Sequence, residues 1–494
     1  MTDLLHLTEP RLLFAHGQAL EDPRDGLTLF GPLDEGRPYG VRYGVIGTPE
    51  GIKLLKAWVK RIQRPIVNTP PQVARPPFSG FEATFRVPWD PRPTYEVPIP
   101  SMDLQNCVLL DDRHQRVFRT VDLYAERIAE TMRQQEAPVD LWFVVIPDDV
   151  YKYCRPQATV EASRRIAADA KMSPVYAHRL RLGPSLFPED EAVAAPYHYD
   201  VNFRNQLKAR LLQSGAPTQI VRESTLSPST QQREVLQSSV AWHLATATFY
   251  KTGGRPWKLG DIRTGVCYVG LVFKQDEHGL KQGNAACAAQ MFLDSGDGMV
   301  FRGALGPWRN PTTGDFHLSR EAAKELIGIA VEAYVRSQGA PPRELFVHGK
   351  VRFDDEEWRG FLEAVGSETM IVGVRITDER DFKLYRKGKL PVLRGLASVR
   401  DERTAFLWTK GYTPRLRTYA GREVPRPLRI EVSRGSTAIE TVLADILALT
   451  KLNYNACIFA DGLPVTLKFA DAVGEILTAG PVSEAPPLPF KYYI

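Results

Sequence analysis

Two basic residues, Arg204 and Lys208, lie four positions apart in a stretch with the composition of a helix. Side chains at this spacing share one helix face, so two positive charges repel there unless both contact one anion. Arg204 falls in the early turns, where the helix dipole also attracts negative charge. Gln219 then begins a short apolar strand, and Lys251 ends the next helix. Together these side chains supply donors suited to a phosphate group.

Each of these residues also has a purely structural explanation. Lys251 could satisfy carbonyl groups at its helix end, and Arg204 and Lys208 could lie on a solvated face. The acidic run at residues 354–357 could bind a metal, but it coincides with the expected start of a helix, where carboxylates favour the dipole. We therefore expect no metal at that run.

Positive charge is concentrated in residues 375–429. This segment holds fifteen Lys and Arg against six Asp and Glu, a net +9, whereas the whole chain carries only +5. Aromatic residues are interleaved with these charges. A basic surface of this kind attracts polyanions through counterion release; the alternative is an ordinary solvated face. The aromatic residues are Phe382, Tyr385, Phe406, Trp408, Tyr412 and Tyr419.

The chain ends in an unusual way for an exposed tail. A Pro-rich stretch leads to Lys491, Tyr492, Tyr493 and Ile494, whereas free termini are usually polar and poorly ordered. We expect Ile494 to pack against the protein, which would hold its carboxylate in a defined place. There the carboxylate could accept hydrogen bonds or bind a cation.

Bulk composition limits the class of protein. The 494 residues are enough for two to four domains, each with its own core. No apolar run has the length of a membrane span, and the first residues do not form a signal peptide. Five scattered cysteines without a CxxC pair indicate a reducing compartment and no zinc site. These features predict a cytoplasmic protein that does not contact membranes.

Helices and apolar strands alternate between residues 100 and 258. This alternation predicts a mainly parallel, Rossmann-like sheet, and the absence of GxGxxG argues against a dinucleotide site. Residues 1–99, rich in Pro and Gly, are expected to form a separate N-terminal segment that packs on the rest. The expected helices are 119–135, 201–213 and 231–251, and the expected strands are 140–146 and 218–221.

Residues 259–494 begin with strands and then alternate between helices and strands, which suits an RNase-H-like fold. The expected strands are 264–274, 344–347 and 370–376, with a hairpin over 288–303 that turns near residues 295–298. Ser319 and Gly339 should begin and end a helix, and another should start at Asp355. Thr437 and Glu440 have the spacing of a capping box for a later helix.

The order of the basic motifs resembles the MID domain of prokaryotic Argonaute proteins. An Arg-x-x-x-Lys helix, a Pro-Thr-Gln strand and a Lys-x-Gly-Gly-x-Pro-Trp helix end follow one another. In that family the matching side chains hold the 5′-phosphate of a guide strand, so the resemblance implies this role for Arg204, Lys208, Gln219 and Lys251. The fold class is then α/β, with a Rossmann-like MID domain at 100–258 and an RNase-H-like PIWI domain at 259–494.

The end of the chain, including the Pro-Val-Thr and Phe-Ala-Asp motifs at 464–471, resembles the PIWI domain of the same family. There a C-terminal carboxylate helps to bind a metal ion at the guide 5′-phosphate. The resemblance implies a Mg²⁺ ion held by the Ile494 carboxylate, and Gln219 could add its amide oxygen because hard cations take oxygen ligands.

Two departures separate the chain from long, cleaving Argonautes. It is too short to hold their additional N-terminal and PAZ domains, so it resembles the short branch with MID and PIWI only. Nuclease PIWI domains also hold two divalent cations with carboxylates. Here the expected positions carry Leu271 and His348, and only Asp471 matches. Leu271 cannot bind a cation and His348 is a poor Mg²⁺ ligand, so we expect no catalytic residues.

The resemblance implies guide-dependent recognition of complementary nucleic acid, with a small guide RNA and a single-stranded DNA target. The resemblance further implies a defence role against phage or plasmids and a heterodimer. The partner subunit would carry a PAZ-like domain and a sirtuin-like, TIR or nuclease effector. Two alternatives stay open at this stage. One is an active guide-directed nuclease with a displaced metal set, and the other is an unrelated α/β enzyme that binds an anionic metabolite.

Overall fold

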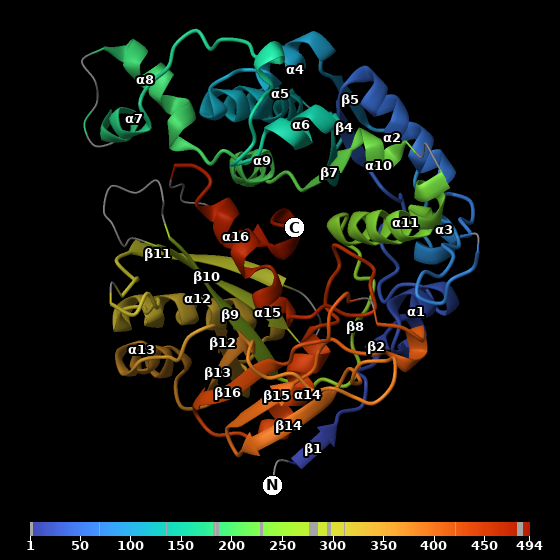
Figure 1. Ribbon diagram of the computed structural model, residues 1–494, viewed down its shortest axis with the longest axis vertical. Helices are drawn as coiled ribbons and strands as arrows, with labels where there is room; N and C mark the ends of the chain where they lie inside the picture. The colour runs from blue at the N-terminus through green and yellow to red at the C-terminus, as the bar shows by residue number, and fades with distance from the viewer. Residues whose placement is uncertain are drawn as a thin grey trace.

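Two helix-covered sheets, one above the other, form most of the molecule (Figure 1). The structure is a computed structural model that describes residues 3–68, 70–134, 136–180, 183, 187–227, 231–275, 285–293, 298–310, 312–419, 421–481 and 488–494. The N-terminus lies at the far end of the lower unit, and the C-terminus lies between the two units. The end of the chain is therefore placed where both units can contact it.

The upper unit is built on a sheet of four parallel strands in the order β5-β4-β6-β7. All six residues of β6 are buried, as expected for an apolar strand covered on both faces. The strands are β4 (Tyr43–Gly47), β5 (Tyr95–Pro98), β6 (Leu141–Ile146) and β7 (Thr218–Arg222).

Helices cover both faces of this sheet. α5 (Arg113–Gln134) and α9 (Phe203–Leu212) pack on one face, and α2 (Pro49–Arg61) and α11 (Gln231–Lys251) pack on the other. Thr48 begins α2 because its hydroxyl accepts the Gly51 N–H, a typical N-cap interaction. Further helices are α1 (Pro23–Leu29), α3 (Phe81–Phe85), α4 (Ser101–Val108), α6 (Asp148–Tyr153), α7 (Pro174–Leu180), α8 (Pro188–Ala194) and α10 (Glu223–Leu226).

The parallel sheet starts earlier in the chain than the sequence indicated. β4 and β5, two of its four strands, come from the segment 1–99 that we had set apart, and β4 pairs with both β5 and β6. β1 (Asp3–His6) instead pairs with β14 (Leu396–Asp401) in the lower unit. Residues 1–99 are thus integral to both sheets. Local patterns could not reveal this, because parallel strands pair across long crossover connections.

The lower unit contains a mixed sheet of ten strands, in the order β1-β14-β15-β16-β13-β12-β9-β10-β11-β17. Its middle combines an antiparallel β9-β10-β11 meander with β12 and β13, which run parallel to β9. Besides β1, the strands of this sheet are β9 (Val266–Gln275), β10 (Ala285–Leu293), β11 (Gly298–Gly306), β12 (Glu344–Gly349), β13 (Met370–Asp378), β14 (Leu396–Asp401), β15 (Thr404–Leu407), β16 (Leu428–Arg434) and β17 (Leu488–Pro489).

One face of the mixed sheet packs against α12 (Arg320–Gln338) and α13 (Asp355–Val365). The other face packs against α14 (Ile439–Leu449), α15 (Val465–Lys468) and α16 (Ala470–Leu477). α15 lies so close to β9 that a Cβ on Gly270 would come within 2.0 Å of the Thr466 carbonyl oxygen. A glycine at this point of β9 lets the helix backbone approach the sheet.

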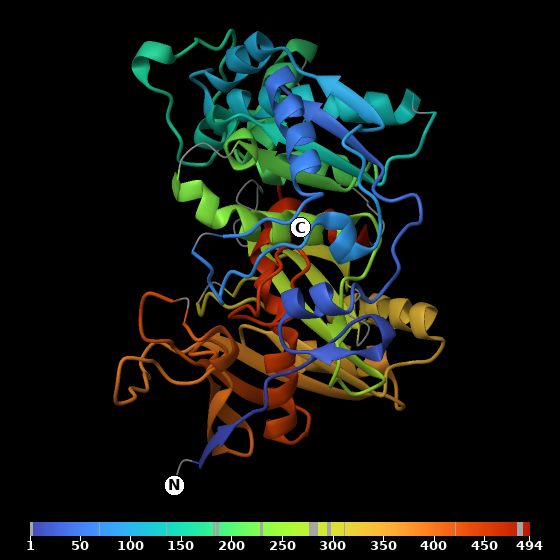
Figure 2. The same cartoon turned by 90° about the vertical axis from the view of Figure 1, so that its right-hand side faces the viewer.

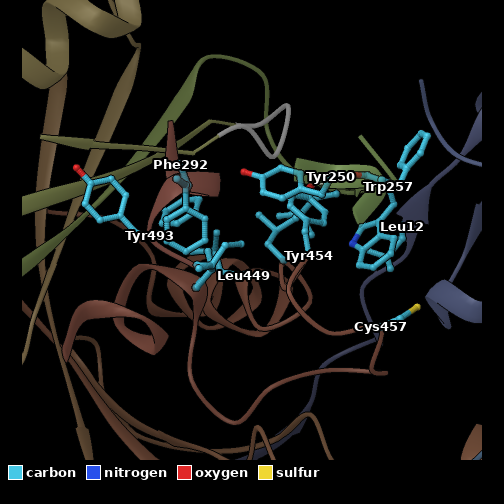
Figure 3. Packing of buried hydrophobic residues seen from close by; sticks show 14 of the residues in the cluster. Leu12, Tyr250, Trp257, Phe292, Leu449, Tyr454, Cys457 and Tyr493 are labelled. Carbon is cyan, nitrogen blue, oxygen red and sulfur yellow. Dashed lines mark hydrogen bonds between the residues drawn. The ribbon is translucent and has the colours of Figure 1, made fainter. Parts of the chain in front are cut away.

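A continuous apolar core joins the two units. Leu12, Tyr250, Trp257, Tyr454 and Tyr493 belong to one buried cluster that includes residues from both sheets (Figure 3). A small sheet, β2 (Leu12–Leu13), β3 (Ala19–Leu20) and β8 (Lys258–Leu259), adds to this junction. Figure 2 shows the blue N-terminal segment running along the lower unit up to the upper one. The junction between the units is therefore part of the folded core.

Most expected elements are confirmed with small changes at their ends. The helix at 231–251 has the expected bounds. The helix beginning at Ser319 and ending at Gly339 is confirmed, since Ser319 accepts the Ala322 N–H and Gly339 has a left-handed φ of 80°. The capping box at Thr437 and Glu440 is wrong: α14 begins after Ala438 without a side-chain cap. Most of the expected hairpin turn, residues 295–297, lies outside the described residues. No helix in the described part is long and apolar enough to span a membrane.

Candidate functional site

Arg204, Lys208, Gln219 and Lys251 all line one cavity of about 630 Å³. α9 carries the first two on successive turns, with the Asn202 side chain capping the helix. β7 places Gln219 beside them, and α11 ends at Lys251. The structure thus brings together the four residues that the sequence had selected, and the cavity is also lined by Ile494.

The Lys208 ammonium lies among main-chain oxygens from two parts of the chain. Its Nζ lies 2.8 Å from the main-chain oxygen of Ile494 and 3.3 Å from that of Tyr492. It also lies 3.4 Å from both the carbonyl and the hydroxyl oxygen of Thr218. Arg204 adds a contact of 2.9 Å to the Tyr493 carbonyl. Helix α9 therefore holds the end of the chain through its basic side chains.

Lys251 completes the cluster from the opposite side. Its Nζ donates to the Gln219 side-chain oxygen at 2.8 Å and to the Thr218 carbonyl at 3.0 Å. Its own carbonyl accepts a hydrogen bond of 3.2 Å from the Lys491 ammonium. Thr218 is thus a shared acceptor for both buried lysines, a role that sequence analysis missed.

Burial strongly affects the charges of this cluster. Lys208 is 3% exposed and Lys251 is 1% exposed. Burial, together with Lys251 and Arg204, lowers the pKa of Lys208 well below its ordinary value. Burial and the charge of Arg204 lower the pKa of Lys251 to about 7, and burial also lowers the pKa of Arg204. Loss of water disfavours all three charged forms, and positive neighbours further disfavour those of Lys208 and Lys251.

Side-chain anions do not compensate these charges. Within the described residues, no ion pair with Asp or Glu includes Arg204, Lys208 or Lys251. Glu475 is the one carboxylate that opposes the lowered pKa of Arg204, and it does so through its charge alone. Buried cations normally require a partner, and groups perturbed in this way mark functional sites. The Ile494 carboxylate, which accepts from Lys208, supplies one negative charge, so the cluster retains positive charge that a further anion could balance.

A second group at the cavity was not found from the sequence. The Arg155 guanidinium lies 3.4 Å and the Arg222 guanidinium 4.2 Å from the centre of the Tyr151 ring, and all three residues line the cavity. Tyr151 lies in α6, just after β6, and Arg222 ends β7. The sequence could have indicated these residues, because they follow the carboxyl ends of expected strands, where ligands bind in parallel sheets.

Comparison with solved structures shows what this arrangement is similar to. The structure of Clostridium butyricum Argonaute bound to a guide DNA and a 19-mer target DNA matches all of this chain, with a TM-score of 0.65 and 14% identity. A structure of A. aeolicus Argonaute matches 97% of it, with a TM-score of 0.53 and 15% identity. A structure of Aa-Ago with externally bound siRNA matches 99%, with a TM-score of 0.55 and 15% identity.

This chain has an Argonaute-like fold. It spans about half the length of these relatives: 55%, 56% and 53% of the three chains. No family model matches the sequence, and no curated protein matches it. The similarity thus lies in the three-dimensional arrangement of the elements.

Within the Argonaute-like fold, Leu271 and His348 lie on neighbouring strands but on opposite faces of the sheet. Leu271 is buried in the cluster beneath α12 and α13. The His348 ring lies on the α15 side, where its Nδ1 forms a hydrogen bond of 2.9 Å with the Thr466 hydroxyl. β12 pairs His348 with Gly270, the neighbour of Leu271 in β9. Neither Gly270 nor Leu271 carries a carboxylate.

His348 and Asp471 have environments that differ strongly. His348 is 1% exposed, and burial lowers its pKa to about 3, so its ring is neutral at pH 7. The Asp471 side chain is 74% exposed and forms an ion pair of 3.0 Å with Lys350. The described residues contain no group of three or more His, Cys, Asp or Glu side chains placed to hold a metal ion.

Gln219 and Ile494 fit a divalent cation only in part. Their oxygens are the type that Mg²⁺ binds, and both line the cavity. Each oxygen, however, accepts a hydrogen bond of 2.8 Å from a lysine ammonium, Lys251 and Lys208 respectively. These two oxygens cannot complete an octahedral shell by themselves, so a Mg²⁺ ion there would need the oxygens of a bound phosphate.

The basic segment 375–429 is less uniform than its net charge indicated. The Arg394 side chain is 4% exposed and pairs with Glu9 at 2.9 Å inside the protein. Arg375 lies 3.5 Å from Glu431, and Arg415 pairs with Asp25. Part of the positive charge therefore holds the fold together, and the remainder lies mainly on loops.

Proposed function

We propose that this protein recognises complementary nucleic acid through a bound guide strand, whose 5′-phosphate occupies the cavity of Arg204, Lys208, Gln219 and Lys251. The observation that carries this proposal is the convergence of two buried lysines and the half-buried Arg204, none of which forms an ion pair with a described Asp or Glu. A phosphate group would supply the missing negative charge and accept charge-assisted hydrogen bonds from all three. The Argonaute-like fold provides the structural setting for a guide strand.

We assign the upper unit to a Rossmann-like MID domain and the lower unit to an RNase-H-like PIWI domain. The parallel order β5-β4-β6-β7 supports the first assignment. The second is supported by the central order β11-β10-β9-β12-β13, in which an antiparallel meander is followed by two strands parallel to β9. In this proposal the guide end lies between the units, and base pairing supplies the sequence specificity.

We further propose that the chain does not cut its target. The strand positions around Leu271 and His348 lack carboxylates, and Asp471 forms an exposed ion pair. A Mg²⁺ ion would join the site only together with the guide phosphate, at Gln219 and the carboxylate of Ile494. Target recognition would then act on a partner subunit with a PAZ-like domain and an effector domain, in defence against invading nucleic acid. This partner follows from the resemblance to short Argonautes.

The proposal is tested on nucleic acid extracted from the purified protein. We expect short strands that polynucleotide kinase labels only after phosphatase treatment, which shows 5′-phosphates. A Lys208→Ala, Lys251→Ala double variant should retain little nucleic acid, whereas Lys60→Ala, which removes an exposed lysine of α2, should retain it. Protein reloaded with one guide should capture its complement and not a scrambled strand. Absence of bound strands, or 5′-hydroxyl ends, would contradict the proposal.

A further inference from the structure

A second cavity, of about 410 Å³, lies between two loops of the basic segment. One loop covers residues 384–391, and the other covers residues 418–419 and 421–424. Both belong to the orange region between β13 and β16, from which loops extend beyond the lower unit at the left of Figure 2. None of the residues that line this cavity also lines the cavity around Lys208. It is a separate place on the molecule.

Local contacts give the two loops a defined shape. Gly388 has a φ of 113°, which favours glycine. The Tyr419 ring folds back over Gly421, since a Cβ on Gly421 would lie 2.1 Å from that ring. The second loop is held at its base by backbone pairing of Thr413 with Thr418 and at its far end by a hydrogen bond of 3.2 Å from the Trp408 indole to the Pro425 carbonyl. The cavity is thus held in shape by contacts within its walls and with residues beside them.

The lining combines aromatic rings with positive charge. Tyr385 is 72% exposed, although large apolar or aromatic side chains are usually covered. Arg386, Lys389 and Arg422 are exposed, and in the described part of the chain none of the three forms an ion pair. Glu423 is the one acidic residue of the lining. Phenol rings beside unpaired cations are the features with which proteins bind single-stranded nucleic acid.

We propose that this cavity binds an unpaired nucleotide of a nucleic-acid strand. The base lies against the rings of Tyr385 and Tyr419, and Arg386, Lys389 and Arg422 contact the neighbouring phosphates. A base must leave its stack to enter the cavity, so a single strand fits and an intact duplex does not. The inference rests on the proposed function for the type of ligand, and it adds a contact site remote from the 5′-phosphate cavity.

The test uses the full chain and a labelled oligothymidylate with a 5′-hydroxyl end, so that the 5′-phosphate cavity contributes little. Stacking on an aromatic side chain contributes strongly to single-strand binding, and we expect Tyr385→Ala to weaken this binding about tenfold. Tyr385→Phe keeps the ring and should stay within about twofold of the wild type. Lys389→Ala should weaken binding and reduce its dependence on salt.

Two matched variants control for general effects. Tyr176→Ala removes another exposed tyrosine, on α7, and Lys60→Ala removes an exposed lysine on α2; neither should change the affinity. A blunt duplex should bind Tyr385→Ala and wild type equally. In addition, a strand with 5-iodouracil should crosslink to a peptide that contains Tyr385 or Tyr419, a readout that needs no variant.

Several results would overturn this inference. Wild-type affinity in Tyr385→Ala, equal losses for single strand and duplex, or crosslinks confined to other peptides would each exclude the proposed nucleotide site. If polyglutamate displaces the strand from these loops at a lower concentration than oligothymidylate does, the cavity binds acidic protein. Failure of 5′-phosphate recognition would contradict only the proposed function, because the probe has no 5′-phosphate.

Discussion

Lys208 and Lys251 are the residues on which the proposed function chiefly depends. Both are almost completely buried, and both have a lowered pKa caused first by burial. Burying an ammonium group is costly unless it is paired and hydrogen-bonded. Carbonyl groups of Thr218 and Tyr492 supply hydrogen bonds without net charge, and the Ile494 carboxylate supplies one negative charge beside Lys208. One carboxylate does not balance Arg204, Lys208 and Lys251, so an anionic ligand would still be bound.

Replacing either lysine should weaken binding of a 5′-phosphorylated strand. We expect Lys208→Ala and Lys251→Ala each to cost about 1.5–3 kcal/mol, the range for hydrogen bonds to charged groups. Fluorescence anisotropy with a labelled strand measures the effect, and Lys60→Ala is the matched control. If both variants bind as tightly as Lys60→Ala, the cluster does not contact the phosphate.

Binding should also depend on pH. In the strand-free protein Lys251 loses its proton as the pH rises through about 7, whereas a bound phosphate favours the charged form. Binding then takes up protons above pH 7, and the affinity should fall between about pH 7 and about pH 9, at most about tenfold per pH unit for each proton. Lys251→Arg stays charged over this range and should flatten the profile.

The lowered pKa of Lys251 also affects the stability of the strand-free protein. The pKa of Lys251 is lower in the folded than in the unfolded chain, so between pH 7 and its ordinary value of 10.5 the unfolded chain binds more protons. Stability should therefore rise with pH through this window. If the strand-free protein instead loses stability as the pH rises over this range, and the loss disappears when Lys251 is replaced, the lowered pKa of Lys251 is contradicted.

Sequence reasoning succeeded for the residues of the cluster because their spacing and order are local. Arg204 and Lys208 share a helix face by periodicity alone, and Lys251 ends its helix where expected. It could not locate the carbonyl oxygens around Lys208, which depend on how residues 492–494 pack. It also could not show that Leu271 and His348 lie on opposite faces, because that requires the register between β9 and β12.

At the scale of elements, the end of the chain is part of the apolar core that joins the two units. Tyr493 and Ile494 are each 3% exposed and belong to the shared core, so the expectation that Ile494 packs against the protein is confirmed. Burial of side chains this large contributes about 1.5–3 kcal/mol each. Deleting these residues would therefore destabilise the fold, and extending the chain is the cleaner experiment.

A tag placed after Ile494 converts its carboxylate into an amide. If this carboxylate shares a Mg²⁺ ion with the guide phosphate, the tag should weaken loading of a 5′-phosphorylated strand, and an N-terminal tag should not. Chelation of divalent cations should weaken loading of the untagged protein more than that of the C-terminally tagged protein. Equal affinity and equal metal dependence in both proteins would leave Ile494 with a packing role only.

The sheets show where prediction by element reached its limit. The strands within 100–258 and the central strands of the mixed sheet were located within a few residues. The participation of β4 and β5 was missed, since a run of prolines separates β5 from β4 and hides their pairing. The cap of α14 was misjudged because Ala438, not Thr437, precedes its first turn.

At the scale of the whole molecule, the proposal separates recognition from cleavage. A purified, guide-loaded chain should leave a matched target intact in Mg²⁺ or Mn²⁺, because paired-cation hydrolysis needs carboxylates that the positions around Leu271 and His348 do not provide. Gel analysis of labelled target tests this. Guide-dependent cleavage that disappears in Asp471→Ala would show that an active metal site exists.

The most direct test of the central claim compares two strands that differ only at the 5′ end. The strand with a 5′-phosphate should bind the full chain more tightly than the same strand with a 5′-hydroxyl, by about tenfold or more for a phosphate contacted by several charged donors. The difference should shrink to near zero in the Lys208→Ala, Lys251→Ala double variant and persist in Lys60→Ala. Equal affinity of the wild-type chain for the two strands would contradict the account.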